Sequence, residues 1–391
     1  MNLPPLWKIQ RELARAGRKL MHLPAELLRH VYLRRYYDWV LSRQVKRIPG
    51  AVSFGSEIGI FLIFPKTGVL PSHLYALEQM VQAGISPIVV SNLPLSRTDF
   101  AELSPHASLI IERPNFGYDF GGYRDGVLEV ANRFPELTRL WLLNDSAWLV
   151  PQKRTWFDDV RDLNVDFAAA TSNFAMPRVD PANFREITWK FRVTHRNFHY
   201  ASYALGIGPA ILRNPEFVKY WRKLEIRNDK TRTVRRGEIG LSQWVLKHGY
   251  THRATCEVDA LDRELEALTD TEVDRVAREL IIPGDVIPGD VALDAVKEQV
   301  LSLDALSAEG RSDRIAFILT SVSRYACAYC LPSYTLSHRG FQFLKKSPLW
   351  LSPKGAGLML AIISRIQGPV GQDIQQEASR IVRQDAETHI Q

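Results

Sequence analysis

Two short stretches of the chain combine residue types suited to holding a charged ligand. The first, RPNFGYDFGGYRDG (113–126), places glycines beside aspartates, arginines and aromatic rings. The second, Asn144-Asp145-Ser146, follows the apolar run RLWLLN (139–144). Glycine lets a backbone approach a ligand closely and adopt positive φ angles. A single site built from both stretches would explain each of them.

Each stretch also allows a purely structural interpretation. The first precedes a helix expected over 122–134, whose free N–H groups favour a phosphate or another anion. Its glycine spacing matches neither the dinucleotide fingerprint G-x-G-x-x-G nor a P-loop. Alternatively, the glycines form a turn with Asp119 and Asp125 as caps. Asn144-Asp145-Ser146 could likewise be a helix N-cap.

Strands and helices alternate from residue 58 onward. The expected strands are 59–64, 86–92, 108–112, 139–144 and 166–172, and the helices among them are 71–83, 96–103, 122–134 and 155–162. A strand-like run (203–212) and two helices (214–224 and 237–249) follow. This order predicts an α/β fold with a mostly parallel, doubly wound sheet flanked by helices. Ligands bind at the carboxyl ends of the strands in such sheets, and both polar stretches follow a strand.

The basic charge is concentrated in the first 50 residues, which carry eleven basic and three acidic side chains, whereas the whole chain has a net charge of +7. Amphipathic helices are expected over 6–21 and 25–42. They either contact an anionic membrane surface or pack on the protein with a solvated basic face. Because the charge is confined to this segment and no nucleic-acid-binding module surrounds it, a nucleic-acid partner is not expected.

The composition favours a cytoplasmic protein. No run of about 18 apolar residues predicts a membrane-spanning helix, and the N-terminus lacks the features of a secretory signal. Three cysteines do not make a disulfide framework and fit a reducing compartment. Cys327 and Cys330 form a single C-x-x-C without a second ligand pair, so we expect buried apolar side chains there and no zinc site.

The two polar stretches, in this order, carry a family resemblance. ERPNFGYDFGGYRDG (112–126) followed by LWLLNDSAWLVP (140–151) closely resembles the rhamnan synthesis protein F family of bacterial glycosyltransferases. Weaker similarity continues through 199–212, 217–224, 236–250 and 338–350. The resemblance implies a GT-A-like, Rossmann-type sheet that binds a nucleotide-sugar. It also implies inverting transfer of L-rhamnose from dTDP-β-L-rhamnose to a lipid-linked or growing cell-surface polysaccharide, with peripheral attachment at the inner face of the plasma membrane.

The resemblance also implies roles for individual residues. A donor-binding role falls to Asn115, Gly117, Tyr118, Asp119, Gly121, Arg124, Asp125, Asn144, Ser146 and His199. Asp145 stands where GT-A enzymes carry a D-x-D motif that holds a divalent ion, here Mg²⁺ or Mn²⁺. With one carboxylate in the motif, Asp145 either holds such an ion or binds sugar hydroxyls directly. Helix N–H groups and Arg124 could then take over part of the neutralising charge.

Inversion requires a general base beside the acceptor hydroxyl. Glu238 is the only acid in GEIGLSQWVLKHGY (237–250), a segment similar in position to the base-bearing helix of inverting enzymes. The alternative is an acid that merely favours the helix dipole. His199 could bind substrate or be a hydrogen-bonded core histidine. The lysines of FLKKSP (343–348) lie near an acceptor or membrane face, or on a solvated surface, which is the default.

Four parts are expected along the chain. They are a basic segment (1–50), a nucleotide-sugar-binding and catalytic domain (51–256), an acidic helical insertion or lid (257–310), and a helical C-terminal region packed on the catalytic domain (311–391). Asn144 in place of the first aspartate of D-x-D supports a second hypothesis. In it the chain is a catalytically inactive, membrane-associated binding or scaffold module with the same fold.

Overall fold

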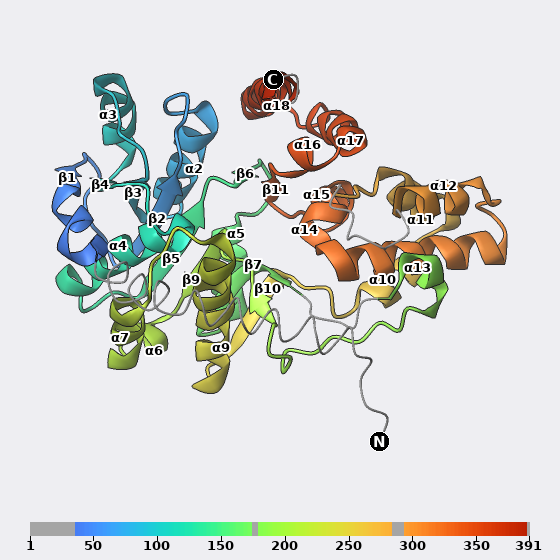
Figure 1. Cartoon of the computed structure of the whole chain (residues 1–391), viewed down its shortest axis with the longest axis horizontal. Helices are drawn as coiled ribbons and strands as arrows, with labels where there is room; N and C mark the ends of the chain where they lie inside the picture. Colours follow the sequence, from blue (N-terminus) through green and yellow to red (C-terminus); the bar gives the residue numbers. More distant parts are fainter. Residues whose placement is uncertain (1–35, 174–178, 284–292, 389–391) are drawn as a thin grey trace, which may run out of the picture.

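The computed structural model describes residues 36–173, 179–283 and 293–388, with a strand-rich half and a helical half (Figure 1). The helix expected over 6–21 lies outside these residues, as does most of the one expected over 25–42. Within the described ranges, no helix is both long enough and apolar enough to cross a membrane.

The predicted α/β sheet is confirmed. Its parallel centre has the spatial order β4-β3-β2-β5, formed by β2 (Glu57–Ile63), β3 (Ser86–Ser91), β4 (Leu109–Glu112) and β5 (Arg139–Asn144). The sheet continues from β5 through the antiparallel β9 (Ala204–Ile207) to β7 (Phe167–Asn173) and β10 (His252–Cys256). At the other edge of the sheet, β1 (Lys46–Pro49) runs antiparallel to β4. The short β8 (His199–Tyr200) pairs with β7, in the part of the sheet beyond β5. The sheet is therefore mostly parallel at its centre and mixed beyond β5.

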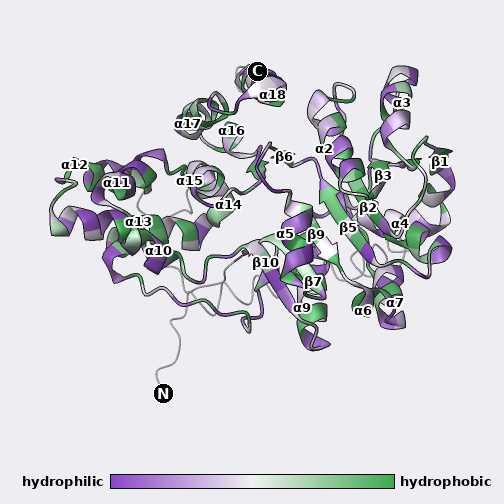
Figure 2. Ribbon diagram, turned by 180° about the vertical axis from the view of Figure 1, so that it is seen from behind, coloured by the Kyte–Doolittle hydropathy of each residue, from purple (hydrophilic) through white to green (hydrophobic). Residues whose placement is uncertain are grey.

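Helices cover both faces of the sheet because the central strands are apolar on both sides. In β2, Ile60 and Leu62 face one layer, and Phe61 and Ile63 face the other. The first layer includes α4 (Tyr118–Arg133), α6 (Pro209–Leu212), α7 (Pro215–Lys223) and α9 (Ile239–Lys247). The second includes α2 (Pro71–Gln82), α3 (Arg97–Leu103) and α5 (Trp156–Leu163). The apolar character of β2 and β5 is visible in Figure 2.

Three predicted elements differ from the structure. Helix α4 begins at Tyr118, not near residue 122, so the second half of the glycine-rich stretch is helical. The run 203–212 is a strand only to Ile207, because Pro209 cannot donate to a sheet and starts the short α6 instead. The helix expected from residue 237 starts earlier, since α8 (Lys230–Thr233) runs through a π-helical turn, η4 (Val234–Glu238), into α9.

The C-terminal region is helical, as expected, and one short strand ties it to the sheet domain. The helices α10 (Leu261–Ala267), α11 (Asp270–Glu279) and α12 (Leu293–Ser302) share an apolar cluster with α13 (Ala308–Tyr325), α14 (Cys327–Cys330) and α15 (Pro332–His338). Then follow β11 (Phe343–Lys345), α16 (Pro348–Leu351), α17 (Pro353–Ile363) and α18 (Gly368–Thr388). Strand β11 pairs antiparallel with β6 (Ala147–Leu149), directly after the Asn144-Asp145-Ser146 stretch.

The expected division into four parts stays a prediction. Strand β1, inside the 1–50 segment, belongs to the main sheet, and α12, inside the acidic window, packs on α13 beyond residue 310. Cys327 and Cys330 are buried, as expected.

Arg113 joins the described N-terminal residues to the glycine-rich stretch. Its buried guanidinium donates to Asp125 Oδ2 at 2.7 Å, to Asn92 Oδ1 at 2.5 Å and to the Phe116 carbonyl at 2.8 Å. The Tyr37 ring centre lies 4.9 Å from the guanidinium carbon, and the Tyr37 hydroxyl hydrogen-bonds to Asp125. Arg113 thus holds four separate segments with one side chain.

Replacing Arg113 by Met should lower the free energy of unfolding by about 3–5 kcal/mol, because the substitution leaves the largely buried Asp125 without its cation. Urea denaturation followed by circular dichroism measures the loss. Arg154→Met is the control: Arg154 pairs with Asp159 and Asp162 on the surface, where solvent screening leaves an ion pair with little effect on stability. Equal losses in the two variants would contradict the anchoring role.

Candidate functional site

A cavity of about 420 Å³ lies at the carboxyl end of β5, where the sheet topology predicts a ligand. Its walls come from the start of α4, the turn between β5 and β6, the segment before β9, the α8–η4 stretch and the C-terminal region. The lining residues are Tyr118, Asp119, Phe120, Asn144, Ser146, Ala201, Ser202, Tyr203, Lys230, Thr233, Val234, Glu238, Tyr329, Lys345, Ser347 and Trp350.

The structure brings the two polar stretches together in this cavity. Asn144 Nδ2 donates a hydrogen bond to Asp119 Oδ2 at 3.1 Å. The Ser146 N–H and hydroxyl both donate to Asn144 Oδ1. Both groups of the Asn144 amide are therefore engaged, and Asn144 fixes the strand end against the first turn of α4.

Asp119 lies in an unusual electrostatic environment. Burial raises the pKa of its carboxyl, and the neighbouring charges of Asp145 and Glu238 act in the same direction, whereas Lys345 and Lys230 oppose the rise; together these effects bring the pKa to about 6. These five charged groups are close enough to influence one titration. Perturbed carboxyl groups of this kind cluster at functional sites.

Asp145 does not line the cavity. Its Oδ2 accepts the Phe64 N–H at 2.7 Å and lies 3.4 Å from Nε2 of the buried His73. His73 Nδ1 accepts the Leu70 N–H, which leaves the ring proton on Nε2, facing Asp145. Although burial raises the pKa of Asp145, the His73 contacts, Lys346 and the Phe64 N–H outweigh it and hold the pKa below its usual value. The carboxylate therefore ties β5 to the end of β2 and to α2.

Glu238 faces the cavity from the π-helical turn η4. Its Oε1 accepts the Ser202 N–H at 2.7 Å, and its Oε2 lies 3.7 Å from His199 Nε2. His199 stands behind Glu238, outside the cavity lining, and also contacts Asn173 and the Asn197 carbonyl. Glu238 thus lies inside a helical stretch, not at its start, and a backbone N–H of the turn between β8 and β9 orients it.

Gly237 is what lets Glu238 approach α4. A Cβ atom at this position would lie 2.3 Å from Cγ of Phe120, the neighbour of Asp119. Extra-wide helical turns are frequent at functional sites, where they aim a side chain that a regular helix would turn away.

Other predicted site residues serve the packing around α4. Arg124 pairs with Asp38 at 2.7 Å and donates to the Trp221 carbonyl, so the expected neutralising role of Arg124 is not supported. Asp125 pairs with Arg113. Gly117, at φ 84°, caps α4 and donates to Asn228 Oδ1. Gly121 and the exposed Asn115 are also absent from the cavity lining.

The sequence did not predict that residues between 329 and 350 form one wall of the cavity. Lys345 Nζ donates to Ser146 Oγ at 2.8 Å across a sequence separation of 199 residues. Lys345 and Lys346 are 6% and 7% exposed, so the default expectation of a solvated surface was wrong. Two lysines in an otherwise apolar short strand were the available signal, but nothing in the sequence indicated that this strand pairs with β6.

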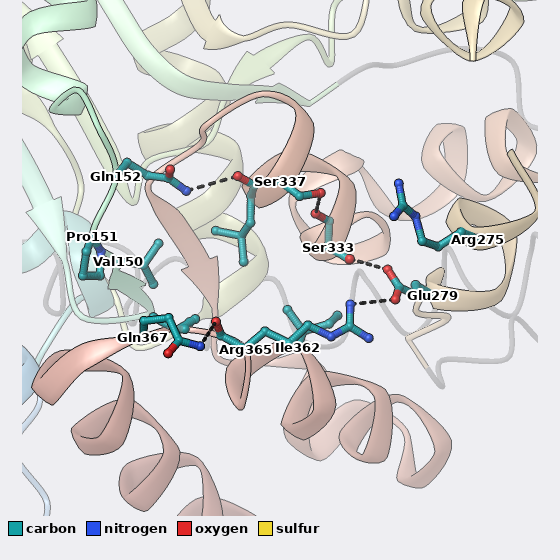
Figure 3. A pocket seen from close by; sticks show the side chains of 12 residues that line it. Val150, Pro151, Gln152, Arg275, Glu279, Ser333, Ser337, Ile362, Arg365 and Gln367 are labelled. Atoms are coloured by element: carbon teal, nitrogen blue, oxygen red, sulfur yellow. Dashed lines mark hydrogen bonds and ion pairs between the residues drawn. The ribbon is translucent and has the colours of Figure 1, made fainter. Parts of the chain in front are cut away.

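A second cavity, also of about 420 Å³, lies between the end of β6 and helices α11, α15 and α17 (Figure 3). Glu279 accepts from Ser333 and pairs with Arg365 at 2.7 Å there, beside the apolar Val150 and Ile362. None of the site residues predicted from the sequence, all of which lie in described ranges, lines it. The cavity at β5 is therefore the candidate active site.

The model of rhamnan synthesis protein F matches residues 87–282, just over half of the chain. The chain belongs to the rhamnan synthesis protein F family. The family match includes Asp119, Asn144 and Glu238, and it ends before the cavity wall that contains Lys345.

One relative is the uncharacterized protein y4gN of Sinorhizobium fredii, which is 32% identical over 237 residues. The alignment covers 60% of this chain and 57% of y4gN, so it spans little more than half of that protein's length.

The solved structures that match this chain are less similar to it than y4gN is in sequence. Core-mannan synthase A of Aspergillus fumigatus, in an Mn/GDP form, is 11% identical with a TM-score of 0.27, over 45% of this chain and 66% of that one. The mannosyltransferase Ktr4p of S. cerevisiae is 10% identical with a TM-score of 0.25, over 52% and 70%. TarS of S. aureus is 11% identical with a TM-score of 0.24, over 85% and 92%. Because these scores are low, family membership rests on the sequence match.

The raised pKa of Asp119 predicts a pH-dependent cost in stability. The pKa of this carboxyl is about 6 in the folded chain and 3.8 in a free aspartate, so its contribution to the free energy of unfolding is fully present below about pH 4 and is lost as the pH rises through 6. Asp119→Asn should therefore raise the free energy of unfolding at pH 8 by up to about 3 kcal/mol. At pH 4 it should change little. Urea titrations at the two pH values measure this, and a gain of equal size at both would contradict the assignment.

Proposed function

We propose that this member of the rhamnan synthesis protein F family is an inverting glycosyltransferase. Its donor is dTDP-β-L-rhamnose, and its acceptor is a lipid-linked or growing cell-surface polysaccharide. One observation carries the proposal: Glu238 faces the Asp119–Asn144 pair across a single cavity at the strand ends. Family membership supports the choice of sugar.

Glu238 is the proposed general base. It takes the proton from the acceptor hydroxyl as that oxygen attacks the anomeric carbon and the bond to the diphosphate breaks. The Ser202 N–H orients one carboxylate oxygen, and His199 lies behind the other. Such support matters because a base must stay within hydrogen-bonding reach of the proton it removes.

The opposite wall is the proposed donor site. Asp119, Asn144 and Ser146 offer carboxylate, amide and hydroxyl groups to sugar and phosphate oxygens. The rings of Tyr118 and Trp350 line the same cavity and are 43% and 44% exposed, which leaves their faces open to stack on the nucleobase or the sugar.

Glu238→Gln should lower kcat for rhamnosyl transfer by about 10²–10⁴-fold, because the amide cannot accept the proton. The dTDP affinity should stay within about twofold, since the shape of the side chain is kept. Transfer of labelled rhamnose measures kcat, and calorimetry measures the affinity. Glu216→Gln, at the exposed start of α7, is the control. A product with retained anomeric configuration in NMR spectra would refute inversion.

A binding or scaffold module without catalysis is the second candidate. The observation that favours it is Asp145, whose carboxylate is engaged by Phe64 and His73, outside the cavity lining. A module of this kind would bind neither dTDP nor UDP in calorimetric titrations, with or without Mn²⁺.

We also propose that the basic segment 1–50 attaches the protein peripherally to the inner face of the plasma membrane. In the described part of this segment, Trp39, Val40 and Arg43 are exposed, a combination of apolar and basic side chains that suits a lipid headgroup surface.

Sedimentation with vesicles tests this attachment. Binding to vesicles with anionic lipid should exceed binding to neutral vesicles and should weaken at high salt, because each basic side chain near the surface contributes about 1 kcal/mol. Equal binding to both vesicle types would contradict an electrostatic attachment.

A further inference from the structure

We propose that the ammonium group of Lys345 supplies the positive charge that a divalent ion supplies in D-x-D glycosyltransferases, so that donor binding and transfer need no metal. This inference rests on the proposed function, because it assigns a charge to the diphosphate of the same donor site.

The residues at the motif position do not fit a divalent ion. The Asp145 carboxylate is hydrogen-bonded to Phe64 and directed toward His73. The Asn144 amide oxygen already accepts two hydrogen bonds from Ser146. Within the described ranges, no three His, Cys, Asp or Glu side chains gather so as to hold a metal ion. Mg²⁺ requires several oxygen ligands in a near-octahedral arrangement, which this set does not offer.

Lys345 occupies the place where such an ion would be needed. Its Nζ donates to Ser146 Oγ at 2.8 Å, and the side chain lines the cavity while being 6% exposed. No carboxylate of a described residue forms an ion pair with it. Its remaining N–H groups are thus not committed to a carboxylate. The ring centres of Tyr203 and Tyr329 lie 4.6 Å and 5.5 Å from Nζ and help to stabilise a buried cation.

The surrounding charges match a diphosphate ligand. Burial lowers the pKa of Lys345 and the charges of Asp119, Glu238 and Asp145 oppose this fall; the resulting pKa of about 8 keeps the ammonium form prevalent at neutral pH. A second cation, Lys230, lines the same cavity. An anionic ligand in the cavity would meet both ammonium groups, whose attraction for it is stronger in this low-dielectric site than in water.

The proposed step is balanced without a metal. The acceptor oxygen forms a bond to the anomeric carbon, and its proton passes to Glu238. The bond from the anomeric carbon to the diphosphate oxygen breaks, and the electron pair stays on that oxygen. The Lys345 N–H groups donate to the diphosphate, which stabilises the charge that develops as it leaves.

The register of β11 supplies a matched control. Lys345 pairs with Ala147 and points into the cavity. The next residue, Lys346, lies over the ring of Trp148 at 5.2 Å and 4.0 Å from Glu377, away from the cavity lining. Both lysines are buried to a similar extent, so either substitution removes one buried positive charge. Only Lys345 faces the proposed donor site.

The experiment is a calorimetric titration of the full chain with dTDP, in EDTA and in MnCl₂, for the original protein and for Lys345→Met, Lys345→Arg and Lys346→Met. The dTDP affinity of the original protein should agree within twofold in the two buffers. Lys345→Met should weaken binding at least tenfold, Lys345→Arg should retain most of it, and Lys346→Met should stay within twofold. Rhamnosyl transfer in EDTA should persist.

The outcomes separate the two proposals. Binding that EDTA abolishes and Mn²⁺ restores would overturn the role of Lys345 and leave the proposed function standing. Unchanged affinity in Lys345→Met would also overturn it. No binding of dTDP or UDP in either buffer would overturn the proposed function itself. The EDTA comparison uses the original chain, so it decides the question even if Lys345→Met does not fold.

Discussion

The hydrogen bond from Asn144 to Asp119 holds the candidate site together. It joins the carboxyl end of β5 to the first turn of α4, two elements that pack on each other through the apolar residues of the sheet. The bond exists because α4 begins at Tyr118, and that start depends on the positive φ of Gly117. A Cβ atom at Gly117 would lie 1.6 Å from Ile226 Cγ2, so the cap also needs the absence of a side chain. One amide thus sets the position of the acid that lines the cavity.

Close packing also positions Glu238, the acid on the opposite wall of the cavity. Gly237 lies against Phe120, which allows the π-helical turn to bring Glu238 beside the segment before β9. A regular helix through this point would turn Glu238 by a different angle and remove its bond to Ser202. The two walls of the cavity are therefore set by close packing, and the acids are carried by rigid elements rather than by loops.

This arrangement of the cavity requires several charged side chains to be buried close together. Asp119, Glu238 and Lys345 line one cavity, where the charge of Glu238 helps to raise the pKa of Asp119 and of Lys345, and a folded chain tolerates such groups only when they are paired or meet a ligand. The charge of Asp145 is stabilised in a different way, by contacts within the protein. One oxygen of its carboxylate accepts a backbone N–H and faces a histidine, and these contacts help to lower its pKa. Asn144, the last residue of β5, thus contacts Asp119 at the cavity, whereas Asp145, in the turn that follows, is directed toward Phe64 and His73.

Much of the fold and part of the site were determined by local sequence. The apolar runs and their helical neighbours specified the parallel strands of the sheet, because burial on both faces leaves a clear pattern. The sheet rule then placed Asp119 and Asn144 at one edge. The orientation of Asp145, the internal ion pair of Arg124 and the start of α4 were decided by contacts that local patterns do not encode. The same holds for Lys345, which reaches Ser146 only because a three-residue strand pairs with β6. Short-range periodicity records which side chains are buried, whereas the partner of a buried charge depends on which distant segment the chain brings against it.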